Sequence, residues 1–582
     1  MIETKRYHRI LWIGTALSLL IGLLFSHHPK FQFNNTASPL PRDITNLPPQ
    51  NDTPREGDPK IEWFLFKLMN TYRNEGLDAA QKYARDHGLE VFENTVRVFV
   101  ETESAGLTHM QIQTRVRLLK SQIETLGGGI ETSHQAFIQS RIPLSSLKSL
   151  ADSPEVRFIR PPVHAHMDVI SEGVSRTGAD TWHSLTPFHP SKTVSVAILD
   201  YGFQGYQSLL GTELPESVTT RAFRADENFE GDSVHGTACG EIVYDMAPDV
   251  EMYLVHPDTL LDFQNAVDWL INKNVDVISH SASWLNINPG DGTGLVCNEV
   301  QKAVQNGIVW VNSAGNYGQR HWSGLFNDPD SDGWHNFSGE DEIFAFNTLA
   351  DVAGTILLNW NDWGVWDGIN YSGSDQDFDL YLYFSDGANY YSINQSGNTQ
   401  NGTQWPVESI SNFSSSTDRL WGMAIKKISA TKNVRFDALL LSCQNLEYSV
   451  PAGSLGSPAD SPYAVAVGAT DWFNDAFHPY SSQGPTLDGR IKPDICAPSG
   501  VSTSSYGSAL LAEKQTSLFV HPASFYGTSA SCPHTAGAAA LLLSKTPYDA
   551  VQVLQILMDR AVDYGPPGKD NKYGYGRLNL RR

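Results

Sequence analysis

The stretch Val194-Ser-Val-Ala-Ile-Leu-Asp200 decides the fold of this 582-residue chain. The six residues before its aspartate are apolar or small, which is typical of a strand buried on both faces of a sheet. Similar apolar stretches recur at residues 250–255, 275–279 and 307–311, and segments with helical periodicity separate them. Alternating strands and helices at this spacing predict an α/β fold with a parallel sheet covered by helices. In such folds functional side chains collect at the carboxyl ends of the strands.

The composition is that of a large folded protein with an acidic surface. Apolar residues make up 41% of the chain, enough for a sizeable core, and the length predicts three or four structural units. The net charge of −23 repels a phosphate backbone, so we expect no nucleic-acid partner. The 5 cysteines are scattered and form no CxxC pattern, which indicates neither a disulfide scaffold nor a zinc site.

The first thirty residues have the pattern of a targeting segment. A basic flank precedes an uninterrupted apolar run over residues 10–25, which is short for a membrane span. We expect residues 1–30 to be a signal peptide or an uncleaved signal anchor. An uncleaved segment would be a single N-terminal membrane anchor. A buried helix is the remaining alternative. Both targeting readings predict an extracellular, secreted protein or one attached to the outer face of the membrane. Residues 31–60, rich in Asn, Pro, Thr and Asp, are predicted to be a disordered linker.

Periodicity divides the rest of the chain into three units. Residues 61–165 follow the order β-α-β-β-α-β, which predicts a compact α+β unit of the split βαβ type. Over residues 336–450 the helical period gives way to short aromatic and β-branched strands between Gly, Asn and Ser clusters, a pattern typical of a β-sandwich. The α/β pattern resumes near residue 464. We therefore expect a sandwich inserted into one α/β domain, whose two parts are residues 166–335 and 451–582.

An acid, a base and a nucleophile stand where predicted strands end or predicted helices begin. Asp200 ends the opening stretch, His235 begins His235-Gly-Thr-Ala-Cys-Gly-Glu, and Ser529 precedes an alanine-rich helix in Gly527-Thr-Ser-Ala-Ser-Cys-Pro-His534. A serine hydroxyl becomes a useful nucleophile when an imidazole accepts its proton and a carboxylate orients that imidazole. Each motif taken singly is more typical of a cap, a turn or a loop residue. Together they predict a catalytic site.

With these motifs in the order Asp, His, Ser, the chain resembles the subtilases, the serine peptidases similar to subtilisin. The resemblance extends over about residues 170–335 and 455–582. It implies a catalytic site of four residues: Asp200, His235, Asn316 and Ser529. Asn316, in Ser313-Ala-Gly-Asn316, would belong to the oxyanion hole.

The same resemblance implies two segments that bind the substrate backbone: Ser281, Ala282 and Ser283, and Ser313, Ala314 and Gly315. Where the family usually has Ser-Leu-Gly, this chain has Ser281-Ala-Ser283. A glycine that would let two backbones approach each other is thus missing, and the pocket for the side chain before the scissile bond stays undefined.

Both additional units also resemble known ones. Residues 61–165 are similar in topology to the subtilisin propeptide, which implies a precursor that cleaves itself between Arg160 and Gly178; a permanent regulatory domain is the alternative. The sandwich, with its Asp-Phe-Asp-Leu-Tyr-Leu-Tyr run, resembles the pre-peptidase C-terminal type of domain found in secreted bacterial proteases. We leave open which partner this sandwich binds.

One acidic run has the spacing of a calcium-binding loop. Asp328, Asp330 and Asp332 alternate with other residues in Asp328-Pro-Asp-Ser-Asp-Gly333, and oxygen ligands at this spacing suit Ca²⁺. Position 12 of the loop is Gly339, so the bidentate glutamate of an EF-hand is absent. A structural calcium ion and an acidic turn are the two alternatives, and the chemistry itself requires no cofactor.

The sequence therefore predicts an exported serine endopeptidase that hydrolyses protein or peptide substrates through an acyl-enzyme. The main alternative is a non-catalytic surface adhesin that keeps the subtilase scaffold and binds through its sandwich. A lipase or esterase would carry Gly-x-Ser-x-Gly, which the residues around Ser529 do not match.

Overall fold

The computed structural model describes the following residues: 57–86, 89–162, 166–167, 173–188, 193–509 and 525–581. The signal or anchor predicted within residues 1–30, and most of the predicted linker, lie outside them. Across the described ranges, no helix combines the length and the apolar character that a membrane crossing requires.

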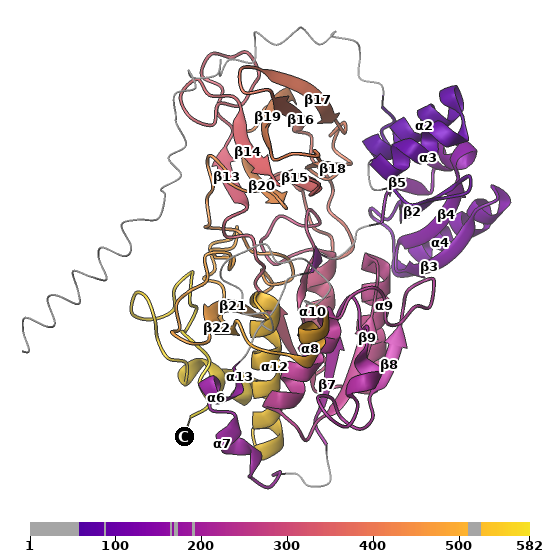
Figure 1. Cartoon of the computed structure of the whole chain (residues 1–582). Helices are drawn as coiled ribbons and strands as arrows, with labels where there is room; N and C mark the ends of the chain where they lie inside the picture. Colours follow the sequence, from indigo (N-terminus) through magenta and orange to yellow (C-terminus); the bar gives the residue numbers. More distant parts are fainter. Residues whose placement is uncertain are drawn as a thin grey trace, which may run out of the picture.

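A seven-stranded parallel sheet is the centre of the lower half of the molecule in Figure 1. Its strand order is β22-β21-β12-β10-β7-β9-β8, and each neighbouring pair is parallel. The strands are β7 (Ser195–Leu199), β8 (Thr219–Ala222), β9 (Glu251–His256), β10 (Val277–His280), β12 (Val309–Ser313), β21 (Val465–Asp471) and β22 (Ile495–Ser499). The predicted α/β class is confirmed. The opening stretch forms β7, in which all five residues are buried.

Helices cover both faces of this sheet. Val196 and Ile198 of β7 point into a core shared with α8, α12 and α13, whereas Ala197 and Leu199 face α9 and α10. This alternation is the pleat of a strand buried on two sides, which explains why its sequence is apolar throughout. The helices of this part are α6 (Val174–Thr177), α7 (Asp180–His183), η3 (Tyr206–Leu209), α8 (His235–Met246), α9 (Leu260–Lys273), α10 (Leu295–Gln305), α11 (Ser504–Ala509), α12 (Thr528–Lys545) and α13 (Ala550–Asp559).

Helix α12 is central to this part of the fold. It contacts α8 and the strands β10, β12, β21 and β22. The close approach depends on small residues, since a Cβ added at Gly537 would lie 2.5 Å from Cβ of Met246. The run Thr535-Ala-Gly-Ala-Ala-Ala540 is therefore a packing surface as well as a helix-forming sequence.

Two four-stranded antiparallel sheets form a β-sandwich between β12 and β21, in the upper half of Figure 1. The sheet orders are β13-β20-β15-β18 and β14-β19-β16-β17, and aromatic side chains such as Phe344 and Trp360 fill the space between them. The first strand begins at His321, ahead of residue 336. The strands are β13 (His321–Leu325), β14 (Phe344–Thr348), β15 (Gly354–Trp360), β16 (Asp377–Ser385), β17 (Tyr390–Ser396), β18 (Val407–Phe413), β19 (Arg419–Ser429) and β20 (Arg435–Leu441).

The N-terminal unit has its own sheet and its own core. Strands β2, β3, β4 and β5 with α4 and α5 follow the order β-α-β-β-α-β, and α2 and α3 precede them. In Figure 1 this unit lies at the side of the molecule, beside both the α/β part and the sandwich. Its elements are α2 (Trp63–Glu75), α3 (Leu77–Asp86), β1 (Val91–Phe92), β2 (Thr95–Thr102), α4 (His109–Thr125), β3 (Gly129–His134), β4 (Phe137–Pro143), η2 (Leu144–Ser146), α5 (Leu147–Ala151) and β5 (Val156–Arg160).

Candidate active site

Three polar side chains lie at the carboxyl edge of the central sheet, where His235 bonds to Asp200 after β7 and Ser529 bonds to Ser281 after β10. Asp200 directly follows β7, His235 is the first residue of α8, and Ser529 is the second residue of α12. Helices α8 and α12 contact each other, and all three side chains are buried. The fold thus gathers groups that lie far apart along the chain.

The imidazole of His235 is held by a carboxylate. Its Nδ1 lies 2.7 Å from Oδ1 of Asp200, and the backbone N–H of Tyr201 donates to the same oxygen over 2.7 Å. Because a carboxylate accepts and does not donate, His235 carries its proton on Nδ1 in this hydrogen bond. Its Nε2 is then the nitrogen that can accept a proton from a hydroxyl.

Ser529 is fixed from two sides. Its Oγ donates to the carbonyl oxygen of Ser281 over 3.2 Å, and the hydroxyl of Ser281 donates back to the carbonyl oxygen of Ser529 over 2.8 Å. Cys239, one helical turn after His235, lies 3.6 Å from that same carbonyl oxygen through its Sγ. The start of α12 is therefore packed against the segment after β10 and against the histidine helix.

Asn316 lies at the N-terminus of α12. Its Oδ1 accepts hydrogen bonds from the backbone N–H of Thr528 over 3.0 Å and from the Thr528 hydroxyl over 3.2 Å. Two donors on Oδ1 set the orientation of the amide and leave Nδ2 as its donor end, at the start of the helix that carries Ser529. Gly315 before it has φ of 105°, a conformation that favours glycine.

A two-stranded pairing occupies the edge next to Ser529. Strand β11 (Ala282–Ser283) pairs antiparallel with β6 (His166–Met167), and Ala282 faces Met167 in the register. Ser281, which precedes β11, is buried, and so are Ala282 and Ser283, the two residues of β11. The edge predicted to bind a substrate backbone is thus already paired with an extended segment from the end of the N-terminal region.

The second predicted substrate segment is tied into the core. Ser313 ends β12, and the Ala314 N–H donates to the carbonyl oxygen of Val467 over 2.9 Å. The Ala314 carbonyl oxygen accepts the N–H of Gly456 over 3.1 Å, and that of Gly315 accepts the N–H of Ser482 over 2.8 Å. In this structure these backbone groups bond to neighbouring strands and loops of the chain.

Comparison with known proteins identifies the family. The family model described as "Subtilase family" matches residues 191–341 and 352–576, together more than half of the chain. The chain belongs to the subtilase family. The two matched ranges contain all seven strands of the parallel sheet and α8 to α13, together with every residue of the site described above except those of β6.

Curated relatives match shorter segments of this subtilase. It is 35% identical over 138 residues to "Serine protease AprX" of Bacillus subtilis (strain 168), which covers 22% of this chain and 30% of that protein. It is 36% identical over 129 residues to "Subtilisin Savinase" of Lederbergia lenta, and this match covers 22% of this chain and 40% of that protein. The chain thus spans less than half the length of these relatives. The solved structure of the Clostridium perfringens CspB protease aligns with a TM-score of 0.47 and 16% identity, covering 70% of this chain and 98% of that one.

Cys239 completes a compact group with Asp200 and His235 in this subtilase. One candidate ligand atom of each lies within 4.8 Å of the others. Burial raises the pKa of the Cys239 thiol well above its usual value, so the sulfur stays protonated at neutral pH. The hydrogen bond between Asp200 and His235 beside this neutral thiol is an arrangement suited to acid–base chemistry.

Sequence reasoning missed two positioning groups. The Thr528 hydroxyl accepts the N–H of Gly315 over 3.2 Å and donates to Oδ1 of Asn316, so it links this segment to the start of α12. The Ser281 hydroxyl, expected only to contact substrate, holds the backbone of Ser529. Their only signal in the sequence is that each lies beside a motif residue, because the contacts join segments more than 200 residues apart.

The predicted cation ligands lie outside this site, in the sandwich. Asp328, Asp330 and Asp332 come together in the loop after β13. They cannot take part in the chemistry at Ser529, since they belong to a different unit of the fold.

Proposed function

We propose that this subtilase is an exported serine endopeptidase, made as a self-processing precursor, that hydrolyses peptide bonds in protein substrates. The observation that carries the proposal is the 2.7 Å contact between His235 Nδ1 and Asp200 Oδ1 in a buried site beside Ser529. This contact leaves Nε2 as the nitrogen that can accept a proton, and α8, which begins with His235, packs against α12, which carries Ser529.

In the proposed reaction the Ser529 hydroxyl attacks the carbonyl carbon of the scissile peptide bond. His235 takes the hydroxyl proton on Nε2 and then gives it to the leaving amine, while Asp200 stabilises the imidazolium through Nδ1. The acyl-enzyme is released when His235 takes a proton from a water molecule, which attacks the ester carbonyl carbon, and returns that proton to Oγ.

The negative charge that develops on the substrate carbonyl oxygen needs donors. We assign this role to Nδ2 of Asn316 and the backbone N–H of Ser529, which lies in the first turn of α12. The positive end of the dipole of that helix also favours an oxyanion there.

The N-terminal unit fits the role of a propeptide, and the pairing of β6 with β11 is the main support. An extended segment on β11 takes the place that a substrate backbone would need, so the precursor would be inactive until that segment leaves. We propose cleavage between Arg160, the last residue of β5, and Gly178.

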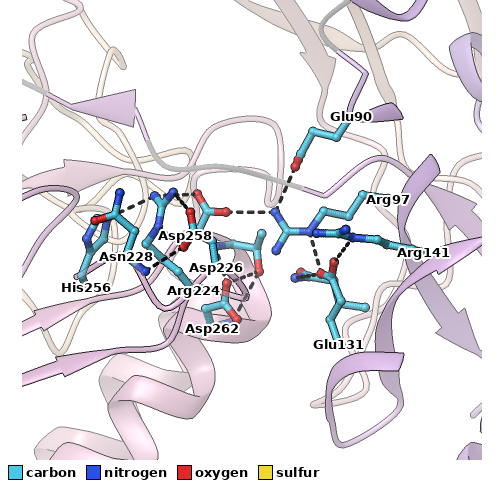
Figure 2. Close-up of polar contacts among 12 residues, drawn as sticks. Glu90, Arg97, Glu131, Arg141, Arg224, Asp226, Asn228, His256, Asp258 and Asp262 are labelled. Atoms are coloured by element: carbon cyan, nitrogen blue, oxygen red, sulfur yellow. Dashed lines mark hydrogen bonds and ion pairs between the residues drawn. The ribbon is translucent and has the colours of Figure 1, made fainter. Parts of the chain in front are cut away.

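An ion-pair network joins the N-terminal unit to the α/β part. Figure 2 shows Arg97 of β2 between Glu90 and Glu131 of its own unit and Asp258 of the α/β part. The distances are 3.0 Å to Glu90, 2.6 Å to Glu131 and 2.9 Å to Asp258, and the Arg97 side chain is only 4% exposed. Arg224 of the α/β part lies 3.7 Å from Asp258 on the far side. Alternating charges across the contact favour a tightly held unit.

The sandwich contacts the same unit. The backbone N–H of Trp63 donates to Oδ1 of Asn398 over 2.8 Å, and Nδ2 of Asn370 donates to Oε2 of Glu101 over 2.7 Å; all four side chains are buried or nearly so. We propose that the N-terminal unit is one partner of the sandwich and that an external partner would need its release.

Active-site labelling tests the peptidase proposal. A fluorophosphonate probe is expected to label processed wild-type protein at Ser529 with loss of peptide hydrolysis, whereas Ser529→Ala takes up no label. Ser531→Ala is the matched control, because Ser531 is a buried serine in the same helix whose hydroxyl bonds to Ala497. N-terminal sequencing of wild type and Ser529→Ala shows whether processing depends on the serine.

The adhesin alternative predicts a different result. An adhesin would show no label in either protein and identical N-termini in both. The adhesin alternative would be excluded if wild type and Ser531→Ala take up the label, Ser529→Ala does not, and processing is lost in Ser529→Ala.

A further inference from the structure

We infer that the sandwich loop of residues 328–333 binds a divalent cation, with Ca²⁺ as the ion it fits best. The inference is independent of the peptidase chemistry, because the loop lies after β13 in the sandwich. Asp328, Asp330 and Asp332 supply the ligands.

The three carboxylates converge at the spacing that a calcium ion needs. One oxygen of each lies within 4.8 Å of the others. Two oxygens that bind one Ca²⁺ at about 2.4 Å can be at most about 4.8 Å apart, and each pair of these carboxylates meets that limit. The donors are all oxygens, which suits calcium and magnesium and not zinc.

Two of these carboxylates each have one oxygen in use and one to spare. The Asp328 side chain is only 3% exposed, and its Oδ2 lies 3.1 Å from Nζ of Lys427. Oδ1 of Asp332 accepts the backbone N–H of Trp334 over 2.9 Å. The other oxygens, Oδ1 of Asp328 and Oδ2 of Asp332, are buried and have no hydrogen-bond partner among the described residues. A buried carboxylate oxygen without a donor is costly, and a bound cation would satisfy both.

The backbone holds the loop in shape. Ser331 and Gly333 have φ of 65° and 94°, which turn the chain back so that alternate side chains point inward. The carbonyl oxygen of Gly333 accepts the N–H of Lys427 over 2.8 Å, and that of Asn327 accepts the N–H of Asn336 over 2.8 Å. The ligands are therefore positioned by strand β19 and by closure of the loop at its base.

Charge balance favours a doubly charged ion. Three carboxylates face one ammonium group, that of Lys427, which is itself 36% exposed. A divalent ion would neutralise the remaining two negative charges. Mg²⁺ demands near-ideal octahedral geometry and keeps several waters, whereas Ca²⁺ accepts an irregular set of carboxylate, backbone and water oxygens such as this loop offers.

Terbium luminescence tests the site directly. The probe is Tb³⁺ alone, titrated into the full chain carrying Ser529→Ala, with excitation of tryptophan; Trp334 directly follows the loop and sensitises a bound ion. We expect saturable emission at one equivalent that Ca²⁺ displaces. Asp328→Asn and Asp332→Asn are expected to weaken Tb³⁺ and Ca²⁺ binding at least tenfold each. Asp386→Asn, which changes an exposed turn carboxylate of the same sandwich, is the matched control and leaves binding unchanged.

A variant that is expected to raise the Ca²⁺ affinity separates loss of the site from a folding defect. Lys427→Met removes the ammonium group that competes for Asp328, so it is expected to tighten Ca²⁺ binding severalfold, a gain that a damaged fold would not give. Emission that is not saturable, or that survives in the Asp328→Asn/Asp332→Asn double variant, would overturn the inference. So would unchanged or weaker Ca²⁺ binding by folded Lys427→Met.

Discussion

Replacing Asp258 by asparagine should loosen the N-terminal unit from the α/β part. Asp258 is the carboxylate on the α/β side that Arg97 reaches across the contact, over 2.9 Å. The substitution keeps the size of the side chain and removes its charge. Arg97 keeps Glu90 and Glu131, so it is not left as an unpaired buried cation.

The expected magnitude follows from the geometry. Two unit charges 2.9 Å apart attract by about 6 kcal/mol at an effective dielectric constant of 20. Desolvation of Arg97, which is 4% exposed, offsets much of this attraction, and the 23% exposure of Asp258 adds screening by water. We expect a net coupling of about 1.5–3 kcal/mol, which corresponds to a dissociation constant about 10- to 150-fold higher.

The assay uses the full chain carrying Ser529→Ala, with a cleavage site for an unrelated protease placed at residues 168–172. The protein is folded, cut and diluted, and the fraction of N-terminal unit still bound is measured against concentration. A double-mutant cycle with Arg97→Met isolates the pair. The matched control is Asp226→Asn, because Asp226 pairs with Arg224 within the α/β part, in the cluster of Figure 2.

A coupling energy below about 0.5 kcal/mol at 0.15 M salt would refute this account of the contact. So would equal effects of Asp258→Asn and Asp226→Asn, since only the first carboxylate bonds across the contact.

Three further predictions concern the site and its surroundings. Asp200→Asn should lower kcat by about 10⁴-fold in peptide hydrolysis, because an amide at this position no longer holds His235 in the required tautomer; a loss below tenfold would contradict the assigned role. Asn316→Ala should lower kcat by about 10²–10³-fold with little change in KM, because it removes a donor used only in the transition state; a change confined to KM would argue against an oxyanion role. Burial raises the pKa of the Glu241 carboxyl from 4.5 to about 7, so the folded chain holds this proton more tightly than the unfolded chain, and the free energy of unfolding falls as pH rises through that interval. Glu241→Gln cannot titrate at this position, so its free energy of unfolding should fall less than that of wild type between pH 4.5 and pH 8, by up to about 3 kcal/mol. Denaturant unfolding of both proteins at both pH values measures this difference. An equal pH dependence in the two proteins would contradict it.

The parallel sheet could be predicted because strands buried on two faces are apolar at every position. β7, β9, β10, β12 and β21 all fall on stretches that the sequence marks as strands. The edge strands β8 and β22 are not predicted: Thr219-Thr-Arg-Ala222 is polar and half-exposed, and Ile495-Cys-Ala-Pro-Ser499 is buried but short and interrupted by a proline. A strand with one partner and little burial leaves no apolar signature.

The chemistry-bearing residues of the site could be predicted from short motifs, and their contacts could not. His235 and Asp200 do lie within hydrogen-bond distance, but nothing local in the sequence indicates that Thr528 orients Asn316 or that β6 pairs with β11. The pair of Arg97 and Asp258 is of the same kind, since the two residues are 161 positions apart. Such contacts depend on how whole units pack.

The late position of α12 has a consequence for the chain during its synthesis. The N-terminal unit, all seven strands of the parallel sheet and the whole sandwich precede Ser529 in the chain, so a ribosome makes them first. A nascent polypeptide of this protein therefore holds Asp200 and His235 without Ser529 while the 294 positions from His235 to Ser529 are added. A product that terminates before α12 lacks Ser529 and cannot assemble this site, even where its parallel sheet has formed.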